Sequence, residues 1–256
     1  MRDAPAGRGG ASGGLGEWLD QRRRARPALL TPARPTVSFT FDLFPRSAAR
    51  TGAALLENVG ARGTFYASGA LAGQVTPHGV LFDATDIDRL QAAGHEIGCA
   101  TYGALNCARA GADDVLADMV RNAEALAALG LDSRLVSFAY PEGRTSTALK
   151  TQLPGRFTSA RGLARGLASG KADLAHLRAN ALYGPAALTR SLALIEAARR
   201  KRGWVIFAAY DVGPRPGPVG TPSGLLERLC GAAFAAGMRI APVRDALRLI
   251  LVESAA

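Results

Sequence analysis

The run TVSFTFD, residues 36–42, combines β-branched and aromatic residues over seven positions and ends in an aspartate. Such a run predicts a buried β-strand, with the aspartate at its carboxyl end. Comparable runs recur along the rest of the chain. The predicted strands cover residues 36–42, 63–68, 96–101, 135–140, 156–161, 177–182, 204–210 and 239–243.

Stretches with helical periodicity separate these strands. The predicted helices lie at about 47–59, 84–93, 112–129, 145–152, 185–202, 222–236 and 243–253. Regular alternation of strand and helix predicts parallel strands joined by right-handed crossovers, and this number of units suits a barrel. We therefore expect an α/β fold, a (β/α) barrel of seven or eight units with parallel strands, over residues 35–256. Residues 1–34 are rich in Gly, Ala, Arg and Pro and predict a flexible leader, with one short helix near 17–24.

Chemistry in a barrel of this kind gathers at the carboxyl ends of the strands. Several of the predicted strands end in or near polar side chains that suit such a site. These residues are Asp42, Thr101, Tyr102, Tyr140, Glu142, Tyr210 and Asp211.

The composition, 48% hydrophobic and 20% charged, is that of a globular protein with a substantial core. Most of the formal charge of +10 comes from arginines spread along the chain. No basic motif with interleaved aromatic residues is present, so we expect no specific nucleic-acid partner.

Cysteine usage and the terminal sequence bear on location. Cys99, Cys107 and Cys230 form no CxxC pair, which argues against a disulfide framework or a zinc knuckle. The N-terminal residues lack the apolar stretch of a secretory signal, and no run approaches the length of a membrane span. The sequence predicts a cytoplasmic protein.

Four segments in this order resemble motifs of the polysaccharide deacetylase family, the NodB-like carbohydrate esterases. They are SFTFDLFP (38–45), GHEIGCATYGALN (94–106), FAYPEG (138–143) and WVIFAAYDVG (204–213). They resemble, in turn, a TFDD segment, a His-Thr/Ser-x-x-His segment, an Arg-x-Pro-Tyr or Tyr-Pro-Tyr-Gly segment, and a final segment that ends in histidine. The resemblance runs from about Pro35 to Leu247 and implies a distorted NodB-like (β/α) barrel with about seven parallel strands.

The resemblance also implies roles for single residues. In the family an aspartate is the base, an aspartate and two histidines bind a divalent metal such as zinc, and a further histidine is the acid. The base position is Asp42 and the acid position is Tyr210. The metal positions hold Leu43, Ala100 and Ala104, which offer no lone pair to a metal. We therefore expect no bound cofactor.

Other interpretations of these residues stay open. Asp42 can instead cap a loop or pair with Arg46, and Asp211 can be a loop aspartate. Asp42 and Glu142 can also form a two-carboxylate site of the glycosidase kind. The histidines, at positions 78, 95 and 176, lack the spaced partner of a metal ligand, and His95 is best interpreted as structural. Cys99 and Cys107 are best interpreted as core thiols.

The sequence thus predicts a polysaccharide deacetylase-like protein that binds a glycan or oligosaccharide and is impaired in metal-dependent deacetylation. The predicted glycan contacts are Tyr102, Tyr140, Glu142, Arg144 and Asp211. The alternative is an active hydrolase that removes N- or O-acetyl groups with Asp42 as base and Tyr210 or Glu142 assisting. A third, weaker hypothesis is a structural partner protein that uses its arginine-rich leader.

Overall fold

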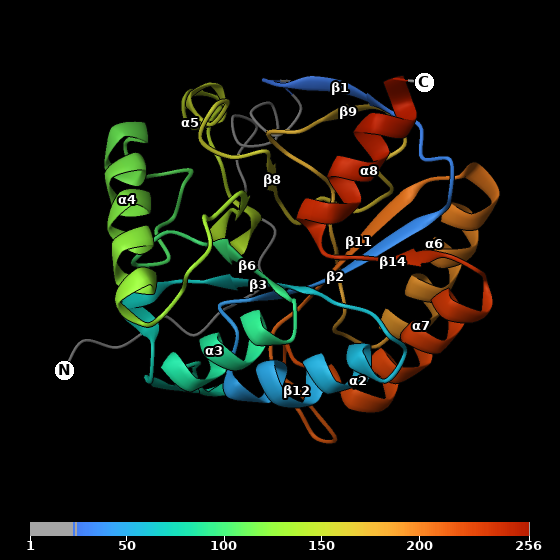
Figure 1. Cartoon of the computed structure of the whole chain (residues 1–256), viewed down its shortest axis with the longest axis horizontal. Helices are drawn as coiled ribbons and strands as arrows, with labels where there is room; N and C mark the ends of the chain where they lie inside the picture. The colour runs from blue at the N-terminus through green and yellow to red at the C-terminus, as the bar shows by residue number, and fades with distance from the viewer. Residues whose placement is uncertain (1–22, 24, 256) are drawn as a thin grey trace.

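A computed structural model describes residues 23 and 25–255 of the chain (Figure 1). Its main sheet follows the order β10-β11-β2-β3-β6-β7-β8, with β14 paired to the first half of β2, and its strand pairings are parallel. The strands are β2 (Thr36–Asp42), β3 (Thr64–Ala67), β6 (Glu96–Cys99), β7 (Ser137–Ala139), β8 (Ser159–Arg161), β10 (Asn180–Ala181), β11 (Trp204–Ala209) and β14 (Arg239–Ile240). Each of these lies within one predicted strand.

Helices connect the strands and cover the sheet (Figure 1). The α-helices are α2 (Ala53–Glu57), α3 (Ala84–Ala92), α4 (Ala112–Ala128), α5 (Thr147–Gln152), α6 (Ala187–Lys201), α7 (Ser223–Ala235) and α8 (Val243–Ala255). A π-helical turn, η1 (Ala48–Gly52), precedes α2, and two 3-10 turns, η2 (Gly69–Leu71) and η3 (Pro141–Gly143), follow β3 and β7. The predicted alternation of strand and helix is confirmed.

The side chains of β2 alternate between two buried faces of the sheet. Phe39 and Phe41 lie in the large apolar cluster that α2, α3 and α7 share with the sheet. Ser38 and Thr40 point to the other face, where their hydroxyl groups donate to backbone carbonyls. Asp42 follows the same alternation, so it lies on the face of Ser38 and Thr40 at the carboxyl end of the strand.

The sheet curls because its two edges approach each other. Leu177, just before β10, forms a parallel bridge with Arg161 at the end of β8. The Gly162 N–H donates to the Leu177 carbonyl at 3.0 Å, and the Leu177 N–H donates to the Ala160 carbonyl at 2.8 Å. The result is a curled half-barrel of parallel strands, which confirms the predicted fold class.

The folded part begins earlier than predicted. Residues 1–22 and 24 lie outside the described residues, and with them most of the predicted leader and its helix. Within the range predicted as leader, however, Pro27–Leu30 forms strand β1, which pairs antiparallel with β9 (Gly170–Asp173). Leu30 is fully buried in the apolar cluster beneath α8. Burial of this side chain and the backbone pairing outweigh the loop-like composition.

Two smaller ribbons were not predicted. β4 (Val75–Thr76) pairs antiparallel with β5 (Gly79–Val80), and β12 (Val212–Gly213) pairs parallel with β13 (Thr221–Pro222). Both are two residues long, too short for a period-2 pattern to be visible in the sequence.

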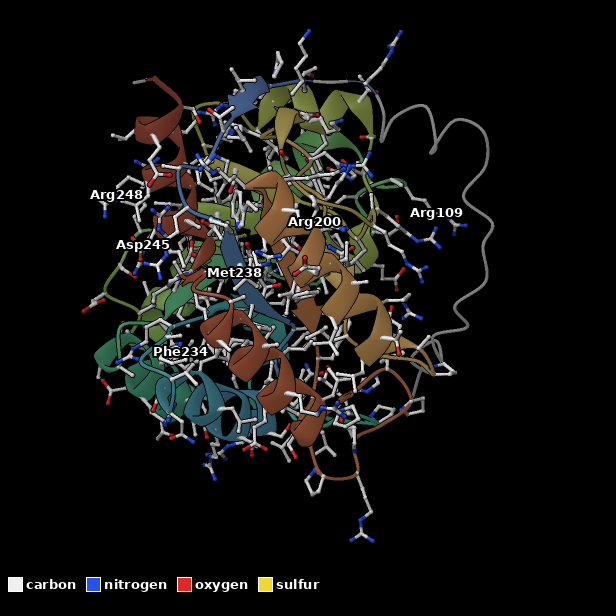
Figure 2. The ribbon with its side chains drawn as sticks, turned by 90° about the vertical axis from the view of Figure 1, so that its right-hand side faces the viewer. Arg109, Arg200, Phe234, Met238, Asp245 and Arg248 are labelled. Atoms are coloured by element: carbon white, nitrogen blue, oxygen red, sulfur yellow. The ribbon has the colours of Figure 1, made fainter. Side chains whose placement is uncertain are left out.

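The surface carries arginines on many elements. Figure 2 shows Arg109, Arg200 and Arg248, on three separate segments, extending into solvent. This distribution agrees with scattered charge rather than one basic patch. Among the described residues, no helix is long and apolar enough to cross a membrane.

Candidate functional site

Asp42 and Arg161 form the centre of the site. Asp42 is 7% exposed, Arg161 is 1% exposed, and Nη2 of the arginine donates to Oδ1 of the carboxylate. Because β2 and β8 are not neighbours in the sheet, the two side chains meet across its concave interior. Burial lowers the pKa of Arg161 to about 9, so the guanidinium stays charged at neutral pH. Arg46, the alternative partner of Asp42, instead pairs with Asp83 and Asp86.

Apolar side chains surround this ion pair. Ala100 follows β6, Ala139 ends β7, and both pack against the buried ring of Tyr66 on β3. Leu43, directly after Asp42, packs against the same cluster. The Arg161 guanidinium lies over the Tyr66 ring at 4.5 Å, a cation–π geometry. Side chains from or next to β2, β3, β6 and β7 thus form one apolar cluster, and Arg161 lies against its Tyr66 ring.

The loops at this edge hold unusual backbone conformations. Leu43, Thr101 and Ala104 have φ angles of +42°, +61° and +52°, a left-handed region that non-glycine residues rarely adopt. Hydrogen bonds hold the loop after β6, which contains Thr101 and Ala104. The Ser68 hydroxyl donates to the Ala100 carbonyl at 2.8 Å, and the Thr101 hydroxyl accepts from the backbone N–H of residue 105 at 2.9 Å. Such strain persists only where the surrounding structure fixes it.

Tyr210, at the end of β11, lies close to a histidine from another loop. The ring of His78, on the turn between β4 and β5, is 6.1 Å from the Tyr210 ring, and its Nδ1 is 3.7 Å from Asp211 Oδ1. Burial, reinforced by nearby Tyr183, raises the pKa of Tyr210 to about 12. Tyr210 is therefore a poor proton donor at neutral pH.

Asp211 is largely buried and holds a loop. Its Oδ2 accepts from the Gly217 N–H at 2.8 Å, and its own carbonyl accepts from the Thr221 N–H at 2.8 Å. These bonds support the alternative interpretation of Asp211 as a loop aspartate.

The prediction that Tyr140 lines a groove is corrected by its burial. Its side chain is 1% exposed, and its ring packs edge-on against Phe138. The hydroxyl donates to the Ala175 carbonyl at 2.8 Å. Pro141 starts the turn η3 directly after Tyr140, and the tyrosine stays in the core before the chain leaves the sheet.

The remaining predicted contacts are more accessible. Tyr102 is half-buried, and the Arg121 guanidinium lies 4.0 Å from its ring centre. The Glu142 side chain is 68% exposed and accepts an ion pair from Arg144 at 3.2 Å. Glu142 pairs with Arg144 and Asp42 pairs with Arg161, so among the described residues each carboxylate has its own cation, which does not support a glycosidase pair.

The chain was compared with protein-family models, curated proteins and solved structures. A family model described as polysaccharide deacetylase matches residues 30–153, which include Asp42, Leu43, Ala100 and Ala104. The match covers somewhat less than half of the chain, over its N-terminal part. No curated protein sequence matches the chain closely enough to count as a relative.

Solved structures of this family share the fold at low sequence identity. A Mycobacterium smegmatis protein assigned to the polysaccharide deacetylases is 16% identical, with a TM-score of 0.66 and coverage of 90% of this chain and 95% of that one. A family 4 acetyl xylan esterase from Clostridium thermocellum, in complex with a cobalt ion, is 18% identical, with a TM-score of 0.59 and coverage of 84% and 91%. A family 4 pseudoenzyme from Bacillus anthracis is 13% identical, with a TM-score of 0.58 and coverage of 85% and 67%.

The residues present do not fit the divalent metal of the polysaccharide deacetylase family. The three positions that the motif resemblance assigns to metal ligands hold Leu43, Ala100 and Ala104, whose side chains carry no donor atom, and the neighbouring Asp42 is engaged by Arg161. Within residues 23 and 25–255, no group of three His, Cys, Asp or Glu side chains is placed to hold an ion.

The other histidines and the cysteines have structural surroundings. His95 accepts from the Gly63 N–H at 2.9 Å and contacts Glu57 at 2.9 Å, as expected of a structural histidine. Cys99 and Cys107 are buried, and burial raises their thiol pKa values to about 11 and about 12. Neither thiol is poised to act as a thiolate.

Sequence reasoning missed Arg161. It is the last residue of the predicted strand 156–161, and the rule that selected Asp42 and Tyr210 applies to it equally. His78 was also missed as a neighbour of Tyr210. Its approach depends on the path of the β4–β5 ribbon, for which the sequence gives no signal.

Proposed function

We propose that this polysaccharide deacetylase-family chain binds N-acetylated glycans and is impaired in metal-dependent deacetylation. One observation carries the proposal: Leu43 and Ala100, at metal-ligand positions of the family, pack with Tyr66 and Ala139 into an apolar cluster beside Asp42. Carbon atoms at these positions supply neither charge nor lone pairs to a cation.

The proton-transfer groups support the same conclusion. The Arg161 guanidinium offsets the charge of Asp42 and takes up one of its oxygen atoms, which weakens it as a base. The pKa of about 12 for Tyr210 keeps its proton bound at neutral pH. A general acid works best with a pKa near the operating pH.

Glycan contacts would come from the more exposed residues of the same edge. Tyr102 and Tyr210 are both half-buried, so part of each side chain is open to a ligand. Tyrosine at such a position stacks on a sugar while its hydroxyl forms a hydrogen bond. Glu142 and Arg144 add polar groups nearby in the chain.

Metal content tests the loss of the metal site. The protein is equilibrated with zinc, cobalt or nickel, desalted, and measured by inductively coupled plasma mass spectrometry. We expect no stoichiometric metal in the wild type and about one ion per chain in the variant Leu43→Asp, Ala100→His, Ala104→His. A mutant of the Bacillus anthracis pseudoenzyme with restored enzymatic activity is a precedent for such a repair.

A matched control separates ligation from simple polarity. The variant Leu43→Asn, Ala100→Gln, Ala104→Gln has similar bulk but lacks carboxylate and imidazole ligands, and it should bind no metal. Stoichiometric metal in the wild type, together with release of acetate from N-acetylglucosamine oligomers, would overturn the proposal in favour of the active hydrolase.

Calorimetric titration with N-acetylglucosamine oligomers tests binding. We expect saturable binding that weakens in Tyr102→Ala. The control is Phe234→Ala, because Phe234 is an aromatic residue of α7 that is 65% exposed and lies outside the site (Figure 2). No heat of binding in the wild type, or equal weakening in both variants, would contradict the glycan-binding role.

A further inference from the structure

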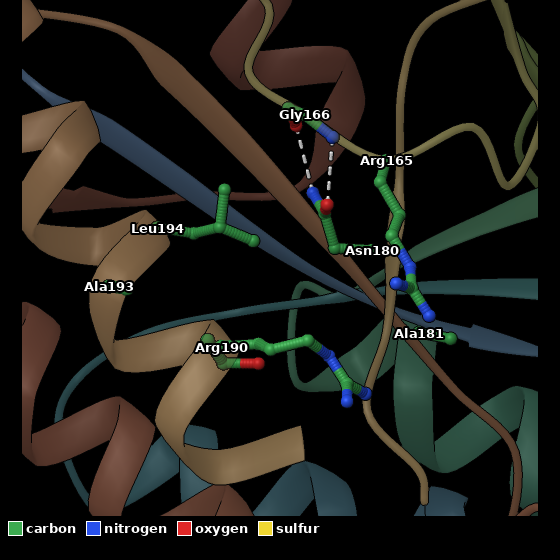
Figure 3. A pocket seen from close by; sticks show the side chains of 8 residues that line it. Arg165, Gly166, Asn180, Ala181, Arg190, Ala193 and Leu194 are labelled. Atoms are coloured by element: carbon green, nitrogen blue, oxygen red, sulfur yellow. Dashed lines mark hydrogen bonds between the residues drawn. The ribbon is translucent and has the colours of Figure 1, made fainter. Parts of the chain in front are cut away.

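A cavity of about 400 Å³ lies apart from the Asp42 site, between the edge of the sheet and α6 (Figure 3). Arg165 and Gly166 come from the loop after β8, Asn180 and Ala181 from β10, and Arg190 and Leu194 from α6. This volume is in the range of small-molecule sites. None of its lining residues belongs to the Asp42 site.

Positive charge is concentrated at one end of this cavity. Figure 3 shows the side chains of Arg165 and Arg190 extending from different walls toward Ala181. No acidic residue lines the cavity, and within the described part of the chain no carboxylate forms an ion pair with either arginine. The Arg190 guanidinium donates through Nη2 to the Tyr183 carbonyl at 3.2 Å. The two guanidinium groups therefore retain unused donors.

The wall that carries Arg165 is fixed in advance. The Asn180 side chain accepts from the Gly166 N–H and donates to the Gly166 carbonyl, both at 2.9 Å (Figure 3). It also donates to the Ile206 carbonyl at 3.1 Å, which ties the loop to β11. The Arg178 guanidinium donates to the Arg165 carbonyl at 2.6 Å. A preformed wall lowers the ordering cost of binding.

The other end of the cavity is apolar. Leu194 and Ala193 present carbon atoms to it. Guanidinium groups match the planar or tetrahedral oxygens of carboxylates and phosphates. We propose that this cavity binds a small molecule with one oxyanion group, held by Arg165 and Arg190, and a short apolar body that lies against Leu194.

Titration calorimetry with hexanoate and hexyl phosphate tests the proposal. Saturable binding of either oxyanion supports it, and the tighter of the two identifies the preferred group. Hexanol, which has the apolar body without the charge, should bind at least about tenfold more weakly, since hydrogen bonds to charged groups are the strong ones.

Two double variants with the same change in charge locate the binding. Arg165→Ala, Arg190→Ala should weaken oxyanion binding at least about tenfold. The control, Arg199→Ala, Arg200→Ala, removes two arginines of α6, the helix that carries Arg190. Both of these arginines pair with Glu196, and their loss should leave oxyanion binding unchanged. Circular dichroism confirms that each variant is folded.

Three results would overturn the proposal. They are no saturable binding of either oxyanion, equal weakening in the two double variants, or hexanol binding as tightly as hexanoate. The second result would indicate a general effect of surface charge, and the third a purely apolar cavity.

Discussion

Two buried ion pairs in this protein differ in how completely their carboxylates are used. Asp173 pairs with the fully buried Lys150 at 2.9 Å and also accepts from the N–H groups of Arg26 and Ala175 at 2.9 and 3.0 Å. Asp42 has one partner among the described residues, Arg161, whose own Nε lacks a hydrogen bond.

The difference separates a structural pair from a site. A carboxylate surrounded by several donors fixes the chain segments that supply those donors. A carboxylate with unused lone pairs, beside a guanidinium with an unused N–H, retains capacity for another molecule. The Asp173 pair therefore joins the segment before β1 to α5 and β9, whereas the Asp42 pair keeps the character of a binding site.

The largest expected effect on stability comes from breaking the Asp173–Lys150 pair. Asp173→Ala removes the carboxylate that pairs with the buried Lys150 ammonium and that accepts from three backbone N–H groups. We expect a loss of about 3–5 kcal/mol in the free energy of unfolding, measured by urea denaturation. The control is Lys171→Met, an exposed cation on the same strand, which should change stability by less than about 0.5 kcal/mol. Equal losses would contradict the structural role of Asp173.

A pH dependence of stability is expected from His176, which lies between the two pairs. Its ring packs against Gly162, next to Arg161, and its backbone N–H donates to the Asp173 carbonyl. Burial, reinforced by Lys150, lowers the pKa of His176 from 6.5 to about 4. Between these values the unfolded chain binds a proton that the folded chain excludes, so stability falls as the pH drops from about 6.5 to about 4.

The His176 contribution amounts to at most about 3–4 kcal/mol, because each pKa unit corresponds to about 1.4 kcal/mol. His176→Gln removes this titration, so its unfolding free energy should depend less on pH than that of the wild type across this window. Burial also lowers the pKa of His95, so some acid sensitivity should persist in the variant. Parallel pH curves for the two proteins would show that His176 is not excluded from protonation in the folded state.

A smaller effect on stability is expected from weakening the Asp42–Arg161 pair. Asp42→Asn keeps the size of the side chain and one acceptor oxygen but removes its charge. We expect a loss of about 2 kcal/mol by urea denaturation, the typical contribution of a hydrogen bond to a charged group. A loss as large as that of Asp173→Ala would mean that both pairs serve the same structural purpose.

The smallest expected effect comes from changing the cation at the Asp42 pair. Arg161→Lys keeps a positive charge but loses the planar group that lies over Tyr66, and we expect a loss of about 1 kcal/mol. The same substitution in a Tyr66→Leu background tests the cause. If the loss is unchanged there, the contact with the ring contributes nothing to stability.

Much of the fold could be predicted because its signals are local. The run 36–42 has the composition of a buried strand, and β2 has the predicted bounds. Asp42 could be predicted as a site residue because it is the last residue of that strand. β1 could not be predicted, because its pairing with β9 joins residues 140 to 146 positions apart and its proline-rich sequence is typical of a loop.

The candidate site was predictable only in part. The apolar residues at positions 43 and 100 could be read directly from the chain. The Asp42–Arg161 pair could not, because it depends on curvature that brings two strands from distant places in the sheet face to face. Tyr140 was misplaced for a related reason: strand-end position does not determine whether a side chain turns inward or outward.

Strand β1 has a practical consequence for recombinant expression. Shortening the gene so that the product starts at residue 35 would delete the partner of β9, the buried Leu30 and the backbone groups that contact Asp173 and Lys150. Such a product should be poorly soluble for reasons unrelated to the arginine-rich segment itself. A truncated form meant to test that segment should retain residue 23 onward.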